Sequence, residues 1–265
     1  MRPNAKADGT KYWEYVLCHV DDVLVVSHEQ QKVMDFLTSH YTMKPGSVKE
    51  PDEYLGAQVG KYTVPGDDGS PREAWSMSSD LYIKRAIADV EKELAETDRF
   101  LKSRVQTPMS SGYRPELDAS PELDARRANY YQGLIGILRW IVELGRVDIL
   151  VPVAMLSRYL TAPRVGHLEE VLHVFAYLKR YGRSSLVFDP GTPVFEGERF
   201  TKCDWDEFYP DAAESMPPKM PEPRGKCVST TCFVDADHAG CRVTRRSQTG
   251  VLLYLQKAPI IWYSK

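Results

Sequence analysis

Two pairs of aspartates in the sequence could do chemistry. Asp21 and Asp22 interrupt the strand-forming run "YVLCHVDDVLVVS", and Asp235 and Asp237 follow the run "TCFV". Adjacent carboxylates repel each other, by about 1 kcal/mol at about 4 Å in bulk water and by about 4 kcal/mol where the effective dielectric constant is about 20. A divalent cation removes this repulsion. Oxygen ligands of this kind suit Mg²⁺, and two such ions can assist phosphoryl transfer.

Each pair also has an ordinary structural explanation. Asp21 and Asp22 have the two-residue span of a tight hairpin turn, and solvated aspartates are common in turns. Asp235 could end its strand and Asp237 could begin a turn before Gly240, whereas a continuing strand would point both carboxylates to one side. The residue types alone do not separate a metal site from a turn.

The elements that would position these residues follow from the spacing of apolar side chains. Short β-branched and aromatic runs predict strands over residues 12–26, 53–64, 227–237, 247–255 and 258–265. A period of 3.6 residues predicts helices over 79–101, 128–145, 147–160 and 166–182.

Two glycines lie inside the second predicted helix, at Gly133 and Gly136. Glycine in a helix interior costs about 1 kcal/mol relative to alanine. We therefore expect both glycines to allow a neighbouring helix to approach closely.

Composition excludes several classes of protein. Hydrophobic content of 43%, charged content of 27% and a net charge of -3 are ordinary for a globular chain, so any contact with nucleic acid must be local. The five cysteines show no zinc-ligand spacing, which favours reduced thiols in a cytoplasmic or nuclear setting. There is no apolar segment of the kind that predicts secretion or a membrane partner.

Four motif blocks, in order, resemble one family. "HVDDVLVVS" resembles the YVDD box of reverse transcriptases, and "YLG" at Tyr54–Gly56 resembles the primer-grip motif that follows it. "TPM" at Thr107–Met109, "YYQGLIGILRWIVELGRVDIL" and "LSRYLTAPRVGHLEEVLHVFAYLKR" are similar to the thumb and connection of Ty1/copia-type retrotransposon polyproteins. "FVDADHAGCRVTRRSQTGVLLYLQKAPIIWYSK" resembles the opening of their RNase H domain.

This resemblance implies an α+β fold divided into four segments. They are a reverse transcriptase palm remnant over 1–74, a helical thumb and connection over 75–188, a Pro-rich acidic linker over 189–224, and the leading antiparallel strands of a truncated RNase H-like domain over 225–265. The implied partners are an RNA template, a DNA primer or an RNA·DNA hybrid, and the remainder of the polyprotein.

The resemblance also implies roles for individual residues. Asp21 would be the principal ligand of Mg²⁺ or Mn²⁺ at the polymerase site and Asp22 a weaker one, while Asp235 would be the first carboxylate of the RNase H metal cluster. Primer binding would fall to three residues, Tyr54, Leu55 and Gly56. His19 stands where the family has tyrosine, and this changes the packing expected at the primer end because imidazole is smaller and can carry charge.

Other ligands that the resemblance implies lie outside this sequence. A third palm aspartate and the fingers would precede the hairpin, where only 20 residues stand before Asp21, and the remaining RNase H carboxylates would follow Lys265. We therefore expect a polyprotein fragment with two incomplete active sites and little or no activity. The alternatives are a non-catalytic nucleic-acid-binding module and an inert remnant.

The basic residues allow two interpretations. The last segment carries an excess of cations that could follow a phosphate backbone or simply be solvated: Arg242, Arg245, Arg246, Lys257 and Lys265. Those of the helical segment are balanced by nearby acids and are expected to be exposed: Arg126, Arg127, Lys179, Arg180 and Arg183. His167 and His173 lack a third ligand, so a zinc site is not expected. Unpaired sheet edges predict poor solubility.

Overall fold

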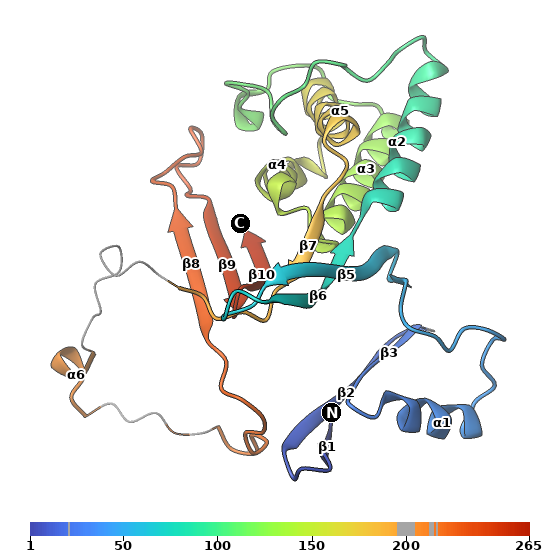
Figure 1. Ribbon diagram of the computed structural model, residues 1–265. Coiled ribbons are helices and arrows are strands. Elements are labelled where there is room, and N and C mark those ends of the chain that lie inside the picture. The colour runs from blue at the N-terminus through green and yellow to red at the C-terminus, as the bar shows by residue number, and fades with distance from the viewer. Residues whose placement is uncertain (21, 195–204, 212–214, 216) are drawn as a thin grey trace. The chain divides into compact units, whose positions relative to one another are not determined.

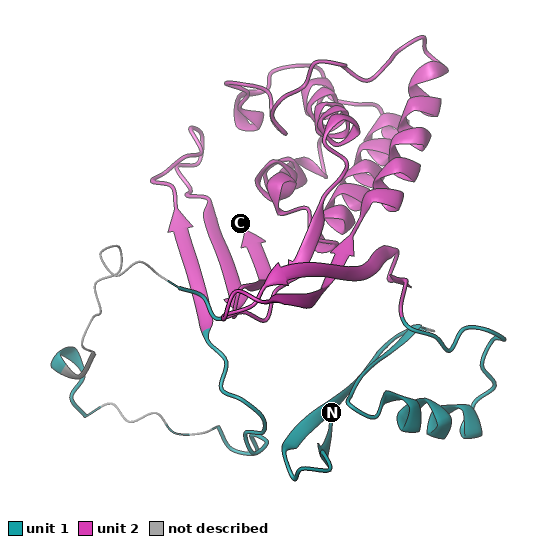
Figure 2. Cartoon of the chain, in the orientation of Figure 1, with its two compact units in different colours: residues 1–50, 192–229 teal, residues 51–191, 230–265 magenta. Residues whose placement is uncertain are grey.

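The computed structural model describes residues 1–20, 22–194, 205–211, 215 and 217–265. The chain forms two compact units (Figure 2). Unit 1 combines residues 1–50 with 192–229, and unit 2 combines residues 51–191 with 230–265.

Unit 1 contains a small antiparallel sheet and a helix (Figure 1). The sheet has the order β1-β2-β3, with β1 at Arg2–Ala5, β2 at Lys11–His19 and β3 at Asp22–Val26. Helix α1, Gln30–His40, follows β3 and buries Val33. A short helix, α6, spans Trp205–Phe208. The predicted linker over 189–224 includes α6 and lies partly outside the described residues.

The first sheet of unit 2 precedes and follows the helices in sequence. Its order is β4-β5-β6-β7 and every pair is antiparallel. The strands span Glu53–Tyr54 (β4), Ala57–Pro65 (β5), Pro71–Ser78 (β6) and Ser185–Phe188 (β7). The chain returns after its last long helix to place β7 beside β6, with Phe188 opposite Trp75.

The helices of unit 2 build its core. They are α2 (Asp80–Ala95), α3 (Ala125–Glu143), α4 (Leu150–Leu156) and α5 (Val165–Arg180), with 3₁₀ turns η1 (Pro115–Leu117), η2 (Val147–Ile149) and η3 (Ser157–Tyr159). Leu138, Phe175 and Leu178 are completely buried between them. The Tyr131 hydroxyl donates to the Leu156 carbonyl over 2.7 Å and joins α3 to α4. The period of 3.6 residues correctly predicted helix in all four regions.

The last three strands form the second sheet of unit 2. Its order is β10-β9-β8, with β8 at Thr230–Ala236, β9 at Thr249–Leu255 and β10 at Ala258–Ser264, all antiparallel. Trp262 of β10 packs against the helical core, and its indole N–H donates to the Val142 carbonyl over 2.9 Å. Helices and antiparallel sheets together give the α+β class that the sequence predicts. The four-segment division stays a prediction.

The glycine prediction is wrong. A Cβ atom added at Gly133 or Gly136 would meet no atom within 4 Å, so neither glycine allows a close approach. A crowded helical glycine is Gly166 in α5, where an added Cβ would lie 1.8 Å from the Asp118 carboxylate. That carboxylate is held in place by the Tyr113 hydroxyl at 2.8 Å and the Ser120 amide at 2.9 Å.

Candidate metal and nucleic-acid sites

The polymerase-like motif lies on the β2–β3 hairpin of unit 1. The strands pair from Tyr15 opposite Val26 to His19 opposite Asp22. Asp22 is therefore the first residue of β3, and the prediction that Asp21 and Asp22 form the turn is wrong, because strand pairing extends one residue further than the sequence pattern suggested. Asp21 itself lies outside the described residues.

Asp22 is available as a ligand. Cross-strand partners share one face of a sheet, so Asp22 and His19 lie side by side on the face that also carries Leu17. Asp22 is exposed, and within the described part of the chain its carboxylate makes no hydrogen bond or ion pair. Nothing in that part of the structure competes with a cation for its oxygens.

The tip of this hairpin carries backbone strain. Val20 has φ of 55° and is 94% exposed. A β-branched residue in the left-handed region is an outlier, and such strain costs on the order of 1–3 kcal/mol and clusters at functional sites. Positive φ is also typical of the tight turns that join paired strands, so the position of Val20 at the hairpin tip accounts for its conformation.

The opposite face of the hairpin carries a carboxylate that is already hydrogen-bonded within the chain. Glu14 is buried and accepts hydrogen bonds from Arg2 Nε at 2.7 Å, Asn4 Nδ2 at 2.9 Å and Ser27 Oγ at 2.6 Å. The Ser27 hydroxyl is the main cause that lowers the pKa of Glu14, with Asn4 and Arg2 adding to it against the opposing effect of burial. Glu14 thus ties β1 and β2 to the residue that follows β3.

The YLG motif forms a tight turn in unit 2. Tyr54 of β4 pairs with Ala57 of β5, and the two residues between them, Leu55 and Gly56, have φ of 53° and 81°. Two consecutive residues with positive φ are typical of the type I′ turn that joins paired strands. The structure therefore gathers Tyr54, Leu55 and Gly56 on one hairpin, and their role in primer binding stays a prediction.

The two aspartates of the last segment have different surroundings. Asp235 lies within β8 opposite Gly250, is exposed, and has no side-chain hydrogen bond or ion pair in the described part of the chain. Asp237 comes just after the strand, and its carboxylate accepts the Gln248 amide at 2.5 Å. An added Cβ at Gly240 would lie 1.7 Å from it. Asp237 therefore closes the β8–β9 loop, and only Asp235 is free to bind a metal.

The two histidines of α5 have structural roles. His167 is buried, accepts the Arg164 amide at Nδ1 over 3.0 Å, and places Nε2 3.0 Å from the Pro115 carbonyl. His173 bridges Ser110 and a backbone carbonyl. Within the described ranges, no three residues of the types His, Cys, Asp or Glu are grouped so that they could hold a metal.

Five cations of the helical segment form ion pairs with acids in the described structure. The ion pairs are Arg99–Glu169 at 2.6 Å, Arg126–Glu93 at 3.3 Å, Arg146–Asp148 at 2.7 Å, Arg164–Glu122 at 3.4 Å and Lys179–Glu91. Of the five cations expected to be balanced by nearby acids, Arg126 and Lys179 form ion pairs, whereas Arg127, Arg180 and Arg183 form none in the described structure.

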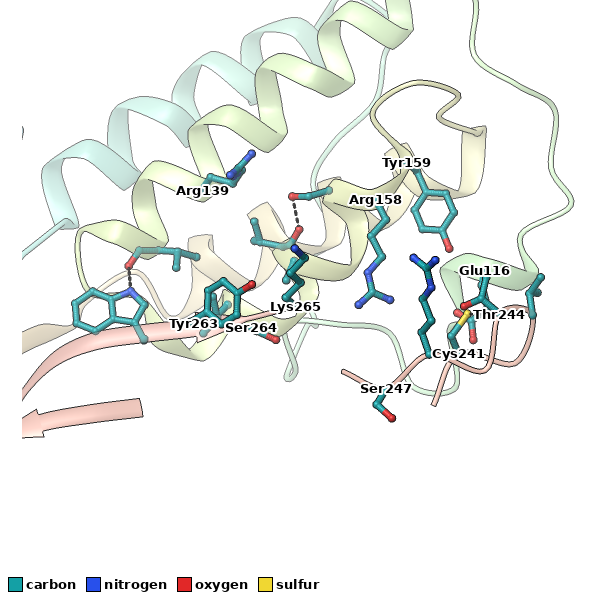
Figure 3. Close-up of a pocket in the computed structure, with 18 of the residues that line it drawn as sticks. Glu116, Arg139, Arg158, Tyr159, Cys241, Thr244, Ser247, Tyr263, Ser264 and Lys265 are labelled. Carbon is teal, nitrogen blue, oxygen red and sulfur yellow. Dashed lines mark hydrogen bonds between the residues drawn. The ribbon is translucent and has the colours of Figure 1, made fainter. Parts of the chain in front are cut away.

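A cleft of about 820 Å³ lies in unit 2 between the helices and the last sheet (Figure 3). One wall comes from α3, α4 and η3, and the other from the β8–β9 loop and β10. Figure 3 shows Arg158 and Tyr159 at the end where Cys241 and Thr244 approach, with Tyr263 and Lys265 further along. Elements distant in sequence thus build one concave surface.

The cleft holds more cations than acids. Four cations line it: Arg139, Arg158, Arg246 and Lys265. The acids that line it are Glu116 and Glu143. Among the described residues none of the four cations forms an ion pair, in contrast to the paired cations of the helices.

Arg139 and Arg158 were missed as site residues by sequence reasoning. An acid three or four residues away on a helix can pair with an arginine and hold it at the surface. Arg158 has no acid at either spacing, since Ala154, Met155, Thr161 and Ala162 occupy those positions. This lack of a local partner is the signal that the sequence contained.

Comparisons with known proteins identify relatives of the chain. It is 25% identical over 254 residues to a transposon Ty5-1 protein of Saccharomyces cerevisiae. It is 23% identical over 257 residues to the retrovirus-related Pol polyprotein from transposon TNT 1-94 of Nicotiana tabacum, and 25% identical over 256 residues to that from transposon RE1 of Arabidopsis thaliana. No profile of a known protein family and no solved structure matches the chain.

The matches cover most of this chain and a part of each relative. They include 95%, 94% and 95% of the chain, and they span 65% of the Ty5-1 protein but 16% and 14% of the two Pol polyproteins. None of the helices in the described part of the chain has the length and apolar character of a membrane span. The chain is a homologue of Ty5-1 and Ty1/copia-type retrotransposon Pol polyproteins, as its motif blocks indicated.

Proposed function

We propose that the chain derives from the reverse transcriptase and RNase H region of a retrotransposon Pol polyprotein. The activity of origin is RNA-directed DNA synthesis by two-metal phosphoryl transfer, with RNase H cleavage of the RNA strand. The observation that carries the proposal is the HVDD motif at a β-hairpin, where Asp22 is exposed and has no partner among the described residues. In this proposal residues 1–74, from unit 1 and the start of unit 2, supply part of the palm, and the rest of unit 2 supplies the thumb, the connection and the leading RNase H strands.

The carboxylates fit a hard divalent cation. Mg²⁺ or Mn²⁺ would be held by Asp21 and Asp22 at the hairpin and by Asp235 on β8. When bound, such ions stabilise the attacking and leaving oxygens of phosphoryl transfer. Asp22 and Asp235 offer exposed carboxylate oxygens that have no partner in the described part of the chain, and carboxylate oxygen is the donor type that Mg²⁺ takes. An RNA template with a DNA primer, an RNA·DNA hybrid and the remainder of the polyprotein are the proposed partners.

The 265-residue chain alone is expected to be close to inactive. The resemblance implies a third aspartate before the hairpin, and the carboxylates that precede it here are Asp8 and Glu14. Asp8 accepts the Thr10 amide at 2.8 Å in the β1–β2 turn. Glu14 is buried on the face opposite Asp22. Neither is placed to complete the site, and catalysis of this kind depends on a preorganised ligand set.

Iron-mediated cleavage tests the metal site without requiring activity. Fe²⁺ bound in place of Mg²⁺, with ascorbate and peroxide, should cut the backbone beside the hairpin, and excess Mg²⁺ should suppress the cut. The double variant Asp21→Asn/Asp22→Asn should abolish it, whereas Asp8→Asn should leave it unchanged. Unchanged cleavage in the double variant would refute the metal site.

Primer extension tests the expected inactivity. With an annealed RNA template and DNA primer, the chain should add no nucleotides in Mg²⁺ or Mn²⁺. Robust extension that Asp21→Asn removes would overturn this expectation while supporting the proposed origin.

A non-catalytic nucleic-acid-binding module is the second candidate function. It is favoured by the arginines of the β8–β9 loop, because Arg242, Arg245 and Arg246 form no ion pair within the described residues. Filter binding of an RNA·DNA hybrid over a salt series tests it. Affinity should fall steeply with salt if phosphates are contacted. A flat response would exclude phosphate contacts, and with no iron cleavage at the hairpin either, the chain would be an inert remnant.

A further inference from the structure

The cleft of unit 2 is held open by contacts between its walls. Trp262 donates to the Val142 carbonyl over 2.9 Å, and Gln248 donates to Ser264 Oγ over 2.5 Å while it accepts from Arg158. These bonds fix β10 and the end of the β8–β9 loop against α3 and η3. Because the cavity is already formed, its walls lose less conformational entropy when a ligand binds.

The loop that forms one wall is folded on itself. The Cys241 amide donates to the Arg246 carbonyl over 3.1 Å, and the Arg245 amide donates to the Cys241 carbonyl over 2.9 Å. A third bond joins the Arg242 amide to Glu116 of η1 over 3.2 Å. The loop therefore presents Arg246 to the cleft from a defined backbone, and the side chain of the adjacent Arg245 does not line the cleft.

The chemistry of the walls indicates an anionic ligand with an aromatic part. Arg139, Arg158 and Arg246 present guanidinium groups that lack acidic partners in the described structure, and guanidinium is well suited to phosphate. Trp262, Tyr159 and Tyr263 line the same cleft. Nucleic-acid bases stack on aromatic side chains wherever a single strand is bound.

The size of the cleft agrees with such a ligand. Its volume of about 820 Å³ lies within the range of about 300–1,000 Å³ found for ligand pockets. Val142 and Val153 add an apolar surface that a purely electrostatic phosphate contact would not need. An extended acidic peptide would use the cations but not the aromatic side chains.

We propose that this cleft binds a short single-stranded segment of nucleic acid, with phosphates at Arg158 and Arg246 and a base against the aromatic side chains. The inference rests on the proposed function, which supplies the choice of nucleic acid as the class of ligand. It assigns binding to a surface built by α4, η3, the β8–β9 loop and β10. None of the proposed metal ligands lines this surface, although Asp235 lies in the same sheet as β10.

The chain offers a matched pair of variants for the test. Arg246→Gln removes a cleft cation, and Arg245→Gln removes the same charge from the neighbouring position, which does not line the cleft. Arg246→Lys keeps the charge. Because neither arginine side chain has a partner in the described structure, all three variants should unfold at the temperature of the original chain.

Binding of a labelled short oligothymidylate, measured by fluorescence anisotropy in EDTA, is the first readout. Arg246→Gln should weaken binding roughly tenfold, the loss of one charge-assisted contact, and should reduce the log–log salt slope by about one. Arg245→Gln should change affinity by less than about threefold, and Arg246→Lys should retain most of it. Equal losses of affinity in Arg246→Gln and Arg245→Gln would show that the oligothymidylate responds to the total charge of the loop and not to the cleft, and would overturn the proposal.

Alkylation of Cys241 is the second readout, because this thiol lines the cleft. The oligothymidylate should slow its reaction while Cys18 and Cys227 serve as internal controls. Inorganic phosphate, thymidine monophosphate and an oligoglutamate peptide are the competing ligands. Protection by the peptide or by phosphate alone, equal to that by the oligothymidylate, would overturn the assignment to a nucleic-acid strand.

The two proposals fail independently. EDTA removes any metal, so the oligothymidylate assay does not depend on the hairpin, and Asp22→Asn should leave it unchanged. Loss of iron cleavage at the hairpin with intact cleft binding would refute the metal site alone. The reverse result would refute the cleft alone.

Discussion

The helical core of unit 2 and the hairpin of unit 1 are both rich in apolar residues, yet they use them differently. Leu138 and Phe175 are completely buried among the helices. Tyr15, Leu17 and Val26 of the hairpin are 45%, 44% and 53% exposed. Apolar burial therefore stabilises the helices, whereas the hairpin depends on strand hydrogen bonds and on the polar contacts of its buried glutamate.

The cations show a parallel contrast. Five cations of the helical segment form ion pairs, among them Arg99 and Arg126, whereas none of the four cations that line the cleft forms one among the described residues. The same distinction separates Glu14 from Asp22 and Asp237 from Asp235.

The largest effect is expected in the helical core. Leu138→Ala should lower the free energy of unfolding by about 2–5 kcal/mol, because it removes buried methyl groups and leaves a cavity. The same truncation in the hairpin, Leu17→Ala, should change it by no more than about 0.5 kcal/mol. Urea denaturation followed by circular dichroism measures both. Similar costs at the two positions would break the comparison between the units.

The crowded glycine should give the next largest effect. Gly166→Ala should destabilise unit 2 by about 1–3 kcal/mol, because the new Cβ would overlap the Asp118 carboxylate. Gly133→Ala is the matched control and should stabilise the chain by about 0.5–1 kcal/mol, since it meets open space in a helix. A double-mutant cycle with Asp118→Ser measures the clash, and additive effects would argue against it.

These two glycines show where sequence reasoning reaches its limit. A period of 3.6 residues locates a helix and its apolar stripe, and it did so for all four helical regions. The period does not report what lies opposite a residue, so it could not distinguish Gly133 from Gly166. The contact of Gly166 is with Asp118, a residue outside its helix.

Strand pairing and the cleft were harder to predict for the same reason. β7 was missed because its partner β6 lies more than a hundred residues earlier, and a four-residue strand has little pattern of its own. The hairpin itself was predicted, but Asp22, which was expected in its turn, is the first residue of β3. Arg158 and Arg246 come from segments that only the fold brings together.

Replacing the buried glutamate of unit 1 should have a smaller, pH-dependent effect. Glu14→Gln weakens three hydrogen bonds and removes the charge that assists them, at a cost of about 1–2 kcal/mol to the hairpin. The folded pKa of Glu14 lies below its ordinary value near 4.5, so its contribution is present above that value and is lost as pH falls through the folded pKa. Amide hydrogen exchange of Leu17 and Leu24, a hydrogen-bonded pair of the hairpin, over a pH series measures it.

The substituted chain provides the control for this pH dependence. The side-chain amide that Glu14→Gln introduces does not titrate, so exchange protection of the hairpin should no longer fall in that acidic range. An unchanged pH profile would mean that another carboxylate controls the stability of the hairpin.

The bond that joins the last sheet to the helices should contribute about 1 kcal/mol. Trp262→Phe removes the indole N–H that donates to the Val142 carbonyl but keeps an aromatic ring against the core. Thermal unfolding should shift down slightly, and exchange of the β10 amides should accelerate more than that of β5. Equal acceleration in both strands would show a general loss of stability rather than a local one.

A substitution on the exposed face of the hairpin should have the smallest effect on stability. Its effect on solubility should be clear. Exposed apolar residues beside the unpaired edge of β3 favour association between copies. Val26→Lys should change the free energy of unfolding by no more than about 0.5 kcal/mol while it raises the soluble, monodisperse fraction seen by light scattering. Thr63→Lys, at an exposed position of the paired strand β5, is the control and should not reduce association. An original chain that is already monodisperse would show that hairpin exposure does not drive association.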